Sequence, residues 1–151
     1  MHLNLIELKV EGVAVDNNSQ PVVILRDEAG DRAVEIWIGP AEAVAITWEL
    51  EHRRPPRPMT HDLIRNIFHD LEVGVERLVI TEVRDATYFG MLVLKVDGEQ
   101  KSIDCRPSDG IAIALRMGAP IFMPDDLLAR IDEERKERQA SFMIDSGGTV
   151  H

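Results

Sequence analysis

The chain has 151 residues, of which 44% are hydrophobic and 29% charged, the balance of an ordinary soluble globular domain. Its formal net charge of −10 argues against loose, non-specific binding to nucleic acid, which depends on many Lys and Arg contacts to phosphates. The single cysteine, Cys105, excludes an intrachain disulfide and a cysteine-based zinc site, and it fits a reducing, cytoplasmic compartment. The first residues lack the pattern of a signal peptide, and no apolar run has the length of a membrane span, so we expect no membrane partner.

The first forty residues have the alternation and the turn sequences of an antiparallel meander. Strands are predicted over 3–16, 21–28 and 32–39, separated by the turn sequences NNSQ and AGD. Gly39-Pro40 ends this pattern, and the residues that follow, 41–52, are rich in helix formers with a broad apolar face. The sequence therefore predicts three strands followed by a helix.

The rest of the chain mixes helices and strands without strict βαβ alternation. The proline-rich segment 53–58 is expected to be an extended loop, because proline removes a backbone donor and fixes φ. We expect an α+β fold: a compact single domain over 1–140 with a largely antiparallel, mixed sheet and about four helices, followed by a flexible tail over 141–151. Further helices are predicted over 60–72, 108–118 and 124–139, and further strands over 75–85, 87–97, 101–105 and 119–123.

Two stretches repeat one pattern, in which Arg-Pro is followed by a hydroxyl residue, an Asp and an apolar helix. The first, RPMTHDL, begins at Arg57, and the second, RPSDGIAIAL, begins at Arg106. The simplest interpretation is helix capping: the hydroxyl of Thr60 or Ser108 accepts from a free backbone N–H, and the Asp of each motif faces the positive end of the helix dipole.

Capping does not account for the two arginines or for His61. The proline after each arginine holds the backbone extended, and the guanidinium fork matches a carboxylate or a phosphate. The motifs can therefore form either an Arg–Asp ion-pair network or an anion site at the helix N-termini. His61 beside Asp62 suits proton transfer or metal binding. Asp104, at the end of a predicted strand, is a candidate to join Asp62 and Asp109 as an oxygen ligand.

Three further features have both a structural and a functional interpretation. Glu42 stands at the start of a predicted helix, where it either complements the dipole or serves as a metal ligand. The segment HRRPPR contains Arg53, Arg54 and Arg57 without an acid, so it is either a solvated loop or a loop that contacts nucleic-acid phosphates. Cys105 is expected to be a small, half-buried residue rather than a nucleophile.

Three stretches, in this order and spacing, resemble the bifunctional nuclease domain family: IWIGPAEAVAI (36–46), RPMTHDLI (57–64) and IDCRPSDGIAIAL (103–115). The resemblance covers roughly residues 3–130. It implies a compact α+β fold, a homodimer or higher homo-oligomer, and the RNase and DNase activity credited to some members. The positions that match the family motifs are Glu42, Arg57, Thr60, His61, Asp62, Asp104, Arg106, Pro107, Ser108 and Asp109.

Two functional hypotheses follow. The first is a metal-assisted nuclease that hydrolyses phosphodiester bonds of RNA or DNA with Mg²⁺ or Mn²⁺. The rival is a non-catalytic, oligomeric ligand- or protein-binding module with a structural Arg–Asp network, which the acidic net charge and the scarcity of aromatic stacking platforms favour. In the nuclease hypothesis the catalytic groups are His61, Arg57, Arg106 and Ser108, and the metal ligands are Asp62, Asp104, Asp109 and, more weakly, Glu42.

Overall fold

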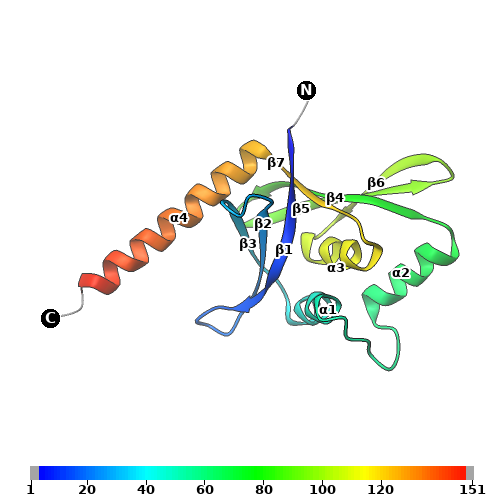
Figure 1. Cartoon of the computed structure of the whole chain (residues 1–151), viewed down its shortest axis with the longest axis horizontal. Helices are drawn as coiled ribbons and strands as arrows, with labels where there is room; N and C mark the ends of the chain where they lie inside the picture. The colour runs from blue at the N-terminus through cyan, green and yellow to red at the C-terminus, as the bar shows by residue number, and fades with distance from the viewer. Residues whose placement is uncertain (1–3, 149–151) are drawn as a thin grey trace.

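The computed structural model describes residues 4–148, which form four helices and one seven-stranded mixed sheet (Figure 1). The predicted α+β class is confirmed. The strands are β1 (Leu5–Val15), β2 (Pro21–Asp27), β3 (Ala33–Trp37), β4 (Gly74–Arg84), β5 (Thr87–Val96), β6 (Glu99–Cys105) and β7 (Ile121–Pro124). The helices are α1 (Pro40–Leu50), α2 (Thr60–Asp70), α3 (Pro107–Met117) and α4 (Asp125–Gly148).

The sheet consists of two antiparallel meanders joined by one short strand. Its order is β3-β2-β1-β7-β4-β5-β6, so β7 lies between the first strand of each meander. β7 runs antiparallel to β1 and parallel to β4, which makes the sheet mixed. The first meander agrees with the predicted strands, and Val23 of β2 lies opposite both Val13 of β1 and Ile36 of β3.

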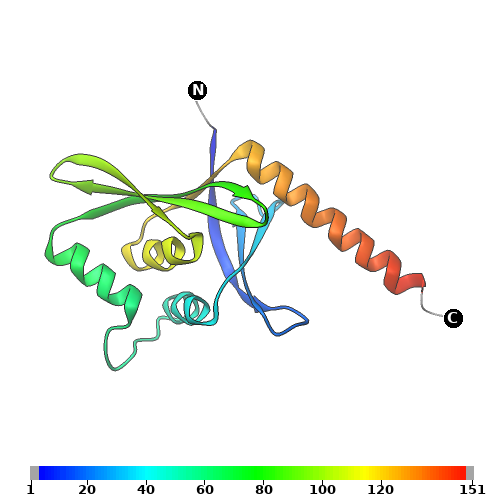
Figure 2. The same ribbon diagram turned by 180° about the vertical axis from the view of Figure 1, so that it is seen from behind.

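Helices α1, α2 and α3 gather on one side of the sheet, away from the projecting end of α4 (Figure 2). The central helix is α3, which contacts β4 and β5 on one side and α1 and α2 on the other. Its apolar residues Ile111, Ala112 and Ala114 are fully buried. The approach to β4 is close at Gly110, where an added Cβ would lie 2.5 Å from Cδ1 of Leu78. This contact holds the first turn of α3 close against β4. Helix α3 in turn contacts α1 and α2 and positions them.

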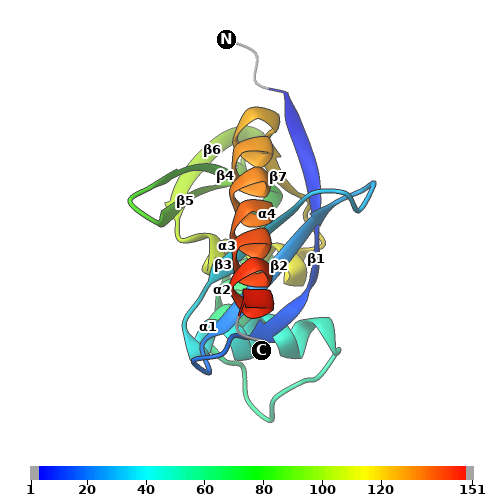
Figure 3. The ribbon, with the colours of Figure 1, turned by 90° about the vertical axis from the view of Figure 1, so that its left-hand side faces the viewer.

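The later turns of helix α4 project away from the sheet (Figure 1), and seen from that side the helix stands in front of the rest of the molecule (Figure 3). Leu127, Leu128 and Ile131 are buried, whereas Phe142 is 65% exposed. The predicted end of this helix, at 139, is wrong: no Gly or Pro interrupts the chain before Gly147, and the helix continues to Gly148. The predicted tail is thus helical up to that residue, and 149–151 lie outside the described residues. Within 4–148, no helix combines the length and the apolar character needed to cross a membrane.

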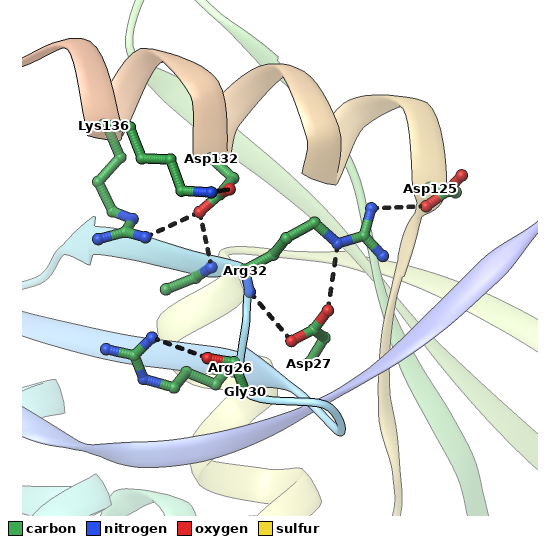
Figure 4. A network of polar contacts seen from close by, with 9 residues as sticks. Arg26, Asp27, Gly30, Arg32, Asp125, Asp132 and Lys136 are labelled. Atoms are coloured by element: carbon green, nitrogen blue, oxygen red, sulfur yellow. Dashed lines mark hydrogen bonds and ion pairs between the residues drawn. The ribbon is translucent and has the colours of Figure 1, made fainter.

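A buried carboxylate joins α4 to β3 (Figure 4). Asp132 accepts hydrogen bonds from the backbone N–H of Ala33 at 3.0 Å and from Arg135 at 2.8 Å, and Lys136 lies 3.0 Å away. Burial opposes the charge of Asp132, but these partners outweigh it and lower its pKa to about 2. The ionised carboxylate therefore holds the helix against the edge strand at neutral pH.

A second ion pair fixes the start of α4 to the β2–β3 turn (Figure 4). Arg32 donates to Asp27 at 3.1 Å and to Asp125 at 2.8 Å. Its backbone N–H also donates to Asp27, at 3.1 Å. One arginine thus links the turn to the first residue of the helix.

Candidate functional site

The two Arg-Pro motifs occupy the starts of α2 and α3, but their hydroxyl residues are not the caps. Met59 and Arg106 hold the N-cap positions, so Thr60 and Ser108 lie inside the first turns. The predicted capping roles of Thr60 and Ser108 are wrong, because α2 already begins at Thr60 and α3 begins at Pro107. In α2 the carboxylate of Asp62 supplies an acceptor instead, receiving the backbone N–H of Met59 at 3.0 Å. Ser108 is buried under the first turn of α3.

The first turns of α1, α2 and α3 supply four side chains that form one connected group, here called the Arg106 cluster. His61 Nε2 and Asp109 Oδ1 are 2.9 Å apart. Arg106 donates through Nε to Asp109 Oδ2 at 2.8 Å and through Nη2 to Glu42 Oε1 at 2.7 Å. The His61 side chain is only 10% exposed, whereas that of Arg106 is 64% exposed. Asp109 thus links an exposed guanidinium to a buried, hydrogen-bonded imidazole.

Both carboxylates of the cluster are ionised at neutral pH. Glu42 accepts its own backbone N–H and then the guanidinium of Arg106, and these contacts lower its pKa. Burial opposes ionisation of Asp109, but hydrogen bonds from Arg106 and His61 outweigh it and lower its pKa. Because Asp109 is ionised, the Nε2–H of His61 donates to it, and Nδ1 remains able to accept a proton.

Gly39 makes room for Glu42 at the start of α1. A Cβ added at position 39 would overlap Oε2 of the Glu42 carboxylate. The carboxylate therefore folds back over the helix N-terminus, where it faces the positive end of the dipole and also reaches Arg106. The sequence left two interpretations of Glu42, dipole complementarity or a metal ligand. Its place in the first turn of α1 and its hydrogen bond to its own backbone N–H agree with dipole complementarity.

Asp62 faces away from the Arg106 cluster and pairs with an arginine that was not among the predicted site residues. Arg116, in the last turn of α3, donates from Nε to Asp62 Oδ1 at 2.8 Å. It also donates to the backbone oxygens of Ala45 at 3.0 Å and Ala112 at 2.9 Å. The two side chains are only 4% and 11% exposed. Burial opposes ionisation of Asp62, but the contacts with Arg116 and Met59 outweigh it and lower its pKa. The pair joins all three helices.

The predicted metal ligands do not converge in this arrangement. Asp104 is exposed on β6, opposite Met91, and no contact joins it to Asp62 or Asp109 within the described residues. The Arg106 and Arg116 guanidinium groups hold the other three carboxylates. In the described part of the chain, no group of three or more His, Cys, Asp or Glu side chains is placed to hold a metal ion. These donors, as arranged, do not fit an Mg²⁺ or Mn²⁺ site.

The predicted basic loop is exposed and lies beside the start of α2. Among residues 4–148, Arg54 and Arg57 have no ion-pair partner, and Arg53 has only a 3.5 Å contact with Glu51. Arg57 precedes α2 but does not join the Arg106 cluster. Cys105 is half-buried, as predicted, and burial, with the nearby charges of Asp104 and Asp109, raises its pKa to about 11. Its thiol is therefore a poor nucleophile at neutral pH.

The comparisons agree with the predicted resemblance. Residues 23–136 match the model of the bifunctional nuclease domain. The chain is 39% identical over 125 residues to an uncharacterized protein of Mycobacterium tuberculosis, a match covering 82% of this chain and 74% of that protein. It is 28% identical over 103 residues to bifunctional nuclease 1 of Oryza sativa subsp. japonica, covering 66% of this chain and 31% of the rice protein. The chain belongs to the bifunctional nuclease domain family.

Proposed function

We propose that this protein hydrolyses phosphodiester bonds of RNA or DNA, and that cleavage takes place at the Arg106 cluster. The observation that carries the proposal is the partly buried hydrogen bond between His61 and Asp109, together with the exposed guanidinium of Arg106 that contacts the same carboxylate. Family membership and the nuclease name of the rice relative support the reaction class. The cluster offers a group that can accept a proton and a cation that can face a phosphate.

The roles follow from the contacts. Asp109 orients the imidazole of His61, whose Nδ1 takes a proton from the attacking water. Nη1 of Arg106 makes none of the hydrogen bonds within the cluster, so it is the nitrogen that faces the phosphate and stabilises the charge that develops on its oxygens. The water oxygen bonds to phosphorus, the bond to the leaving oxygen breaks, and that oxygen takes a proton from solvent while His61 releases to solvent the proton that it removed from the water.

The basic loop supplies the contacts to the rest of the strand. Arg57 stands four residues before His61, so a phosphate bound by Arg57 lies near the N-terminus of α2. Arg53 and Arg54 extend this positive surface along the loop. Guanidinium groups bind phosphates bidentately, and their number sets the dependence of binding on salt. A few such contacts suffice for a chain whose net charge is −10.

No step of this mechanism passes through a metal ion, because the carboxylates do not form a three-ligand set. Whether cleavage requires Mg²⁺ or Mn²⁺ is tested by measuring the cleavage rate with each ion and with EDTA. Asp104, the most exposed of the predicted ligands, is the position to vary: Asp104→Asn lowers a metal-dependent rate if Asp104 binds the ion and leaves it unchanged otherwise.

The test is cleavage of labelled single-stranded RNA and double-stranded DNA by purified protein, with Mg²⁺, Mn²⁺ or EDTA. Wild type is compared with Asp109→Asn and with Asp97→Asn, which changes an exposed turn outside the cluster. Asp109→Asn removes the carboxylate that orients His61, and loss of general-base catalysis lowers rates by about 10²–10⁴-fold. We expect that loss in Asp109→Asn alone, with both variants folded. Equal cleavage by all three proteins would show a contaminating nuclease.

A second candidate function rests on the same contacts. Each of the three carboxylates Glu42, Asp62 and Asp109 is held by an arginine, as the predicted structural Arg–Asp network requires. The protein is then a non-catalytic binding module. In that case wild type cuts neither substrate under any of the metal conditions, and Asp109→Asn lowers the melting temperature without any activity to lose. Thermal shifts with inorganic phosphate then identify an anion ligand.

A further inference from the structure

Two adjoining pockets lie on the α2 side of the buried Asp62–Arg116 pair. The small pocket, of about 200 Å³, lies between the loop after α1 and the start of α2, and Asp62 is one of its walls. The large pocket, of about 700 Å³, lies between α2, the start of β4 and the end of α3, and Arg116 is one of its walls. Arg54 and Arg65 line both pockets, so the two pockets adjoin at these side chains.

The small pocket has an excess of positive charge. Arg53, Arg54 and Arg65 line it together with two carboxylates, Glu49 and Asp62. Asp62 is compensated by Arg116, and Arg53 has its contact with Glu51, so Arg54 and Arg65 face one remaining carboxylate, that of Glu49. This excess stands out in an acidic chain, and a concave surface lined by charge of one sign focuses its field on a ligand of the opposite sign.

The shared arginines are available to a ligand. Arg54 has no ion-pair partner among residues 4–148. Arg65 makes only a 3.4 Å hydrogen bond to the neutral side chain of Asn66 in the same part of the chain. Arg65 acts on the nearby Asp62 only through its charge, and neither guanidinium forms an ion pair with a carboxylate among residues 4–148, unlike those of Arg106 and Arg116. Their donors can therefore receive the oxygens of a phosphate without breaking an ion pair.

The large pocket has a different lining. Phe68, Val73 and Met117 give it apolar, half-buried walls, and the polar side chains of Asn66, His69 and Glu72 line it beside the arginines. A flat aromatic ring packs favourably on Phe68 and Met117, and an amide can pair with the polar edge of a nucleobase. The volume falls in the range of small-molecule sites. A cationic small pocket beside an apolar large pocket matches a phosphate joined through a sugar to a base.

We propose that the two pockets together bind one nucleotide unit. Its phosphate lies between Arg54 and Arg65, and its base lies against Phe68 in the large pocket. The inference rests on the proposed function for the source of the nucleotide, which is the terminal unit of a strand that reaches the Arg106 cluster. It does not rest on cleavage, because the pockets and their charges are separate from His61 and Asp109.

Binding of AMP, measured by isothermal titration calorimetry, tests the site directly. Ribose 5-phosphate and adenosine each carry half of the ligand, so we expect both to bind at least tenfold more weakly than AMP. The variant Arg54→Gln/Arg65→Gln should weaken AMP binding at least tenfold. Arg84→Gln, which changes an exposed arginine at the far end of β4, should leave it unchanged. AMP binding that is absent in wild type, or equal in the double variant, overturns the proposal.

A parallel cleavage assay separates this inference from the proposed function. AMP binding without any nuclease activity supports the nucleotide site and removes the nuclease. Nuclease activity without AMP binding supports the proposed nuclease and overturns the nucleotide site. Competition between AMP and short oligonucleotides, with and without a terminal phosphate, then identifies the source of the nucleotide. Stronger competition by the phosphorylated strand supports a strand terminus, and no competition by either strand overturns that part of the proposal.

Discussion

Replacing Arg116 with Met should destabilise the protein more than the same replacement of any exposed arginine. Arg116 is 4% exposed and is the ion-pair partner of Asp62. Methionine fills much of the volume of the arginine stem but carries no charge. The variant therefore leaves the buried Asp62 without its ion-pair partner, with only the weaker influence of the Arg65 charge, and the carbonyl oxygens of Ala45 and Ala112 lose a charged donor.

The expected loss is large because the pair is desolvated. Removing one partner of a buried ion pair lowers the free energy of unfolding by about 3–5 kcal/mol. For a domain of this size each kcal/mol changes the melting temperature by about 2–4 °C, which gives a decrease of about 6–20 °C. In the variant the pKa of Asp62 rises, because burial remains while the guanidinium is gone.

Urea denaturation followed by circular dichroism measures this loss. Arg84→Met, at a side chain that is 64% exposed, is the matched control and should change the free energy of unfolding by less than about 1 kcal/mol. The double variant Arg116→Met/Asp62→Asn removes both charges, and the asparagine oxygen can still accept the N–H of Met59. It should therefore recover at least half of the loss.

The pH dependence provides an independent check. The folded state lowers the pKa of Asp62, so the stability from this group is present above the unfolded pKa and is lost as pH falls through the folded pKa. The difference between wild type and Arg116→Met should therefore shrink in acid. A loss below about 1 kcal/mol at pH 7, or a double variant as unstable as the single one, would refute the account of Arg116 as the counter-charge of Asp62.

Three further predictions concern other parts of the fold. Asp132→Asn should lower the free energy of unfolding by about 1–3 kcal/mol at pH 7, measured by urea denaturation. The difference should shrink as pH falls below about 4 and disappear only below the folded pKa of about 2, where the wild-type carboxylate is protonated as well. Gly110→Ala should cost about 1–2 kcal/mol, since the crowding against Leu78 exceeds the gain in helix propensity, and adding Leu78→Val should recover part of it. Cys105 should react with iodoacetamide more slowly at pH 8 than a cysteine peptide, with a rate that rises toward pH 11; an equal rate at pH 8 would contradict the raised pKa.

The elements were predictable because their signals are local. Apolar periodicity, turn residues and the prolines after α1 place every strand and helix, with most boundaries within two residues. The end of α4 was missed because the prediction followed the apolar face, which stops at Ile131. The helix continues beyond that face because no Gly or Pro interrupts it before Gly147. The position of β7 was not predictable either, since pairing with β1 and β4 depends on the whole sheet.

The site was predictable only in part, for a geometrical reason. The repeated Arg-Pro pattern correctly singled out residues that meet, since His61 contacts Asp109 across the two motifs. It did not show which arginine forms an ion pair with which carboxylate. Arg116 is 54 positions from Asp62 and, in sequence, is typical of the exposed basic residues in the last turn of a helix. One signal was available: a carboxylate in a buried first turn needs a cation, and few arginines lie in apolar helices.

The position of β7 has a consequence for how the chain reaches this fold. Leu8 of β1 pairs with Ile121, which is 113 positions later in the chain (121 − 8), and Ile121 also pairs with Leu78 of β4. Closing so long a segment is entropically unfavourable, and contacts of this kind slow folding. A chain that is synthesised only as far as Pro120 holds two separate meanders, and β1 and β4 each present an unpaired edge. Those edges are open to pairing with another chain until four residues near the end of the domain arrive, so aggregation during synthesis is the hazard built into this topology.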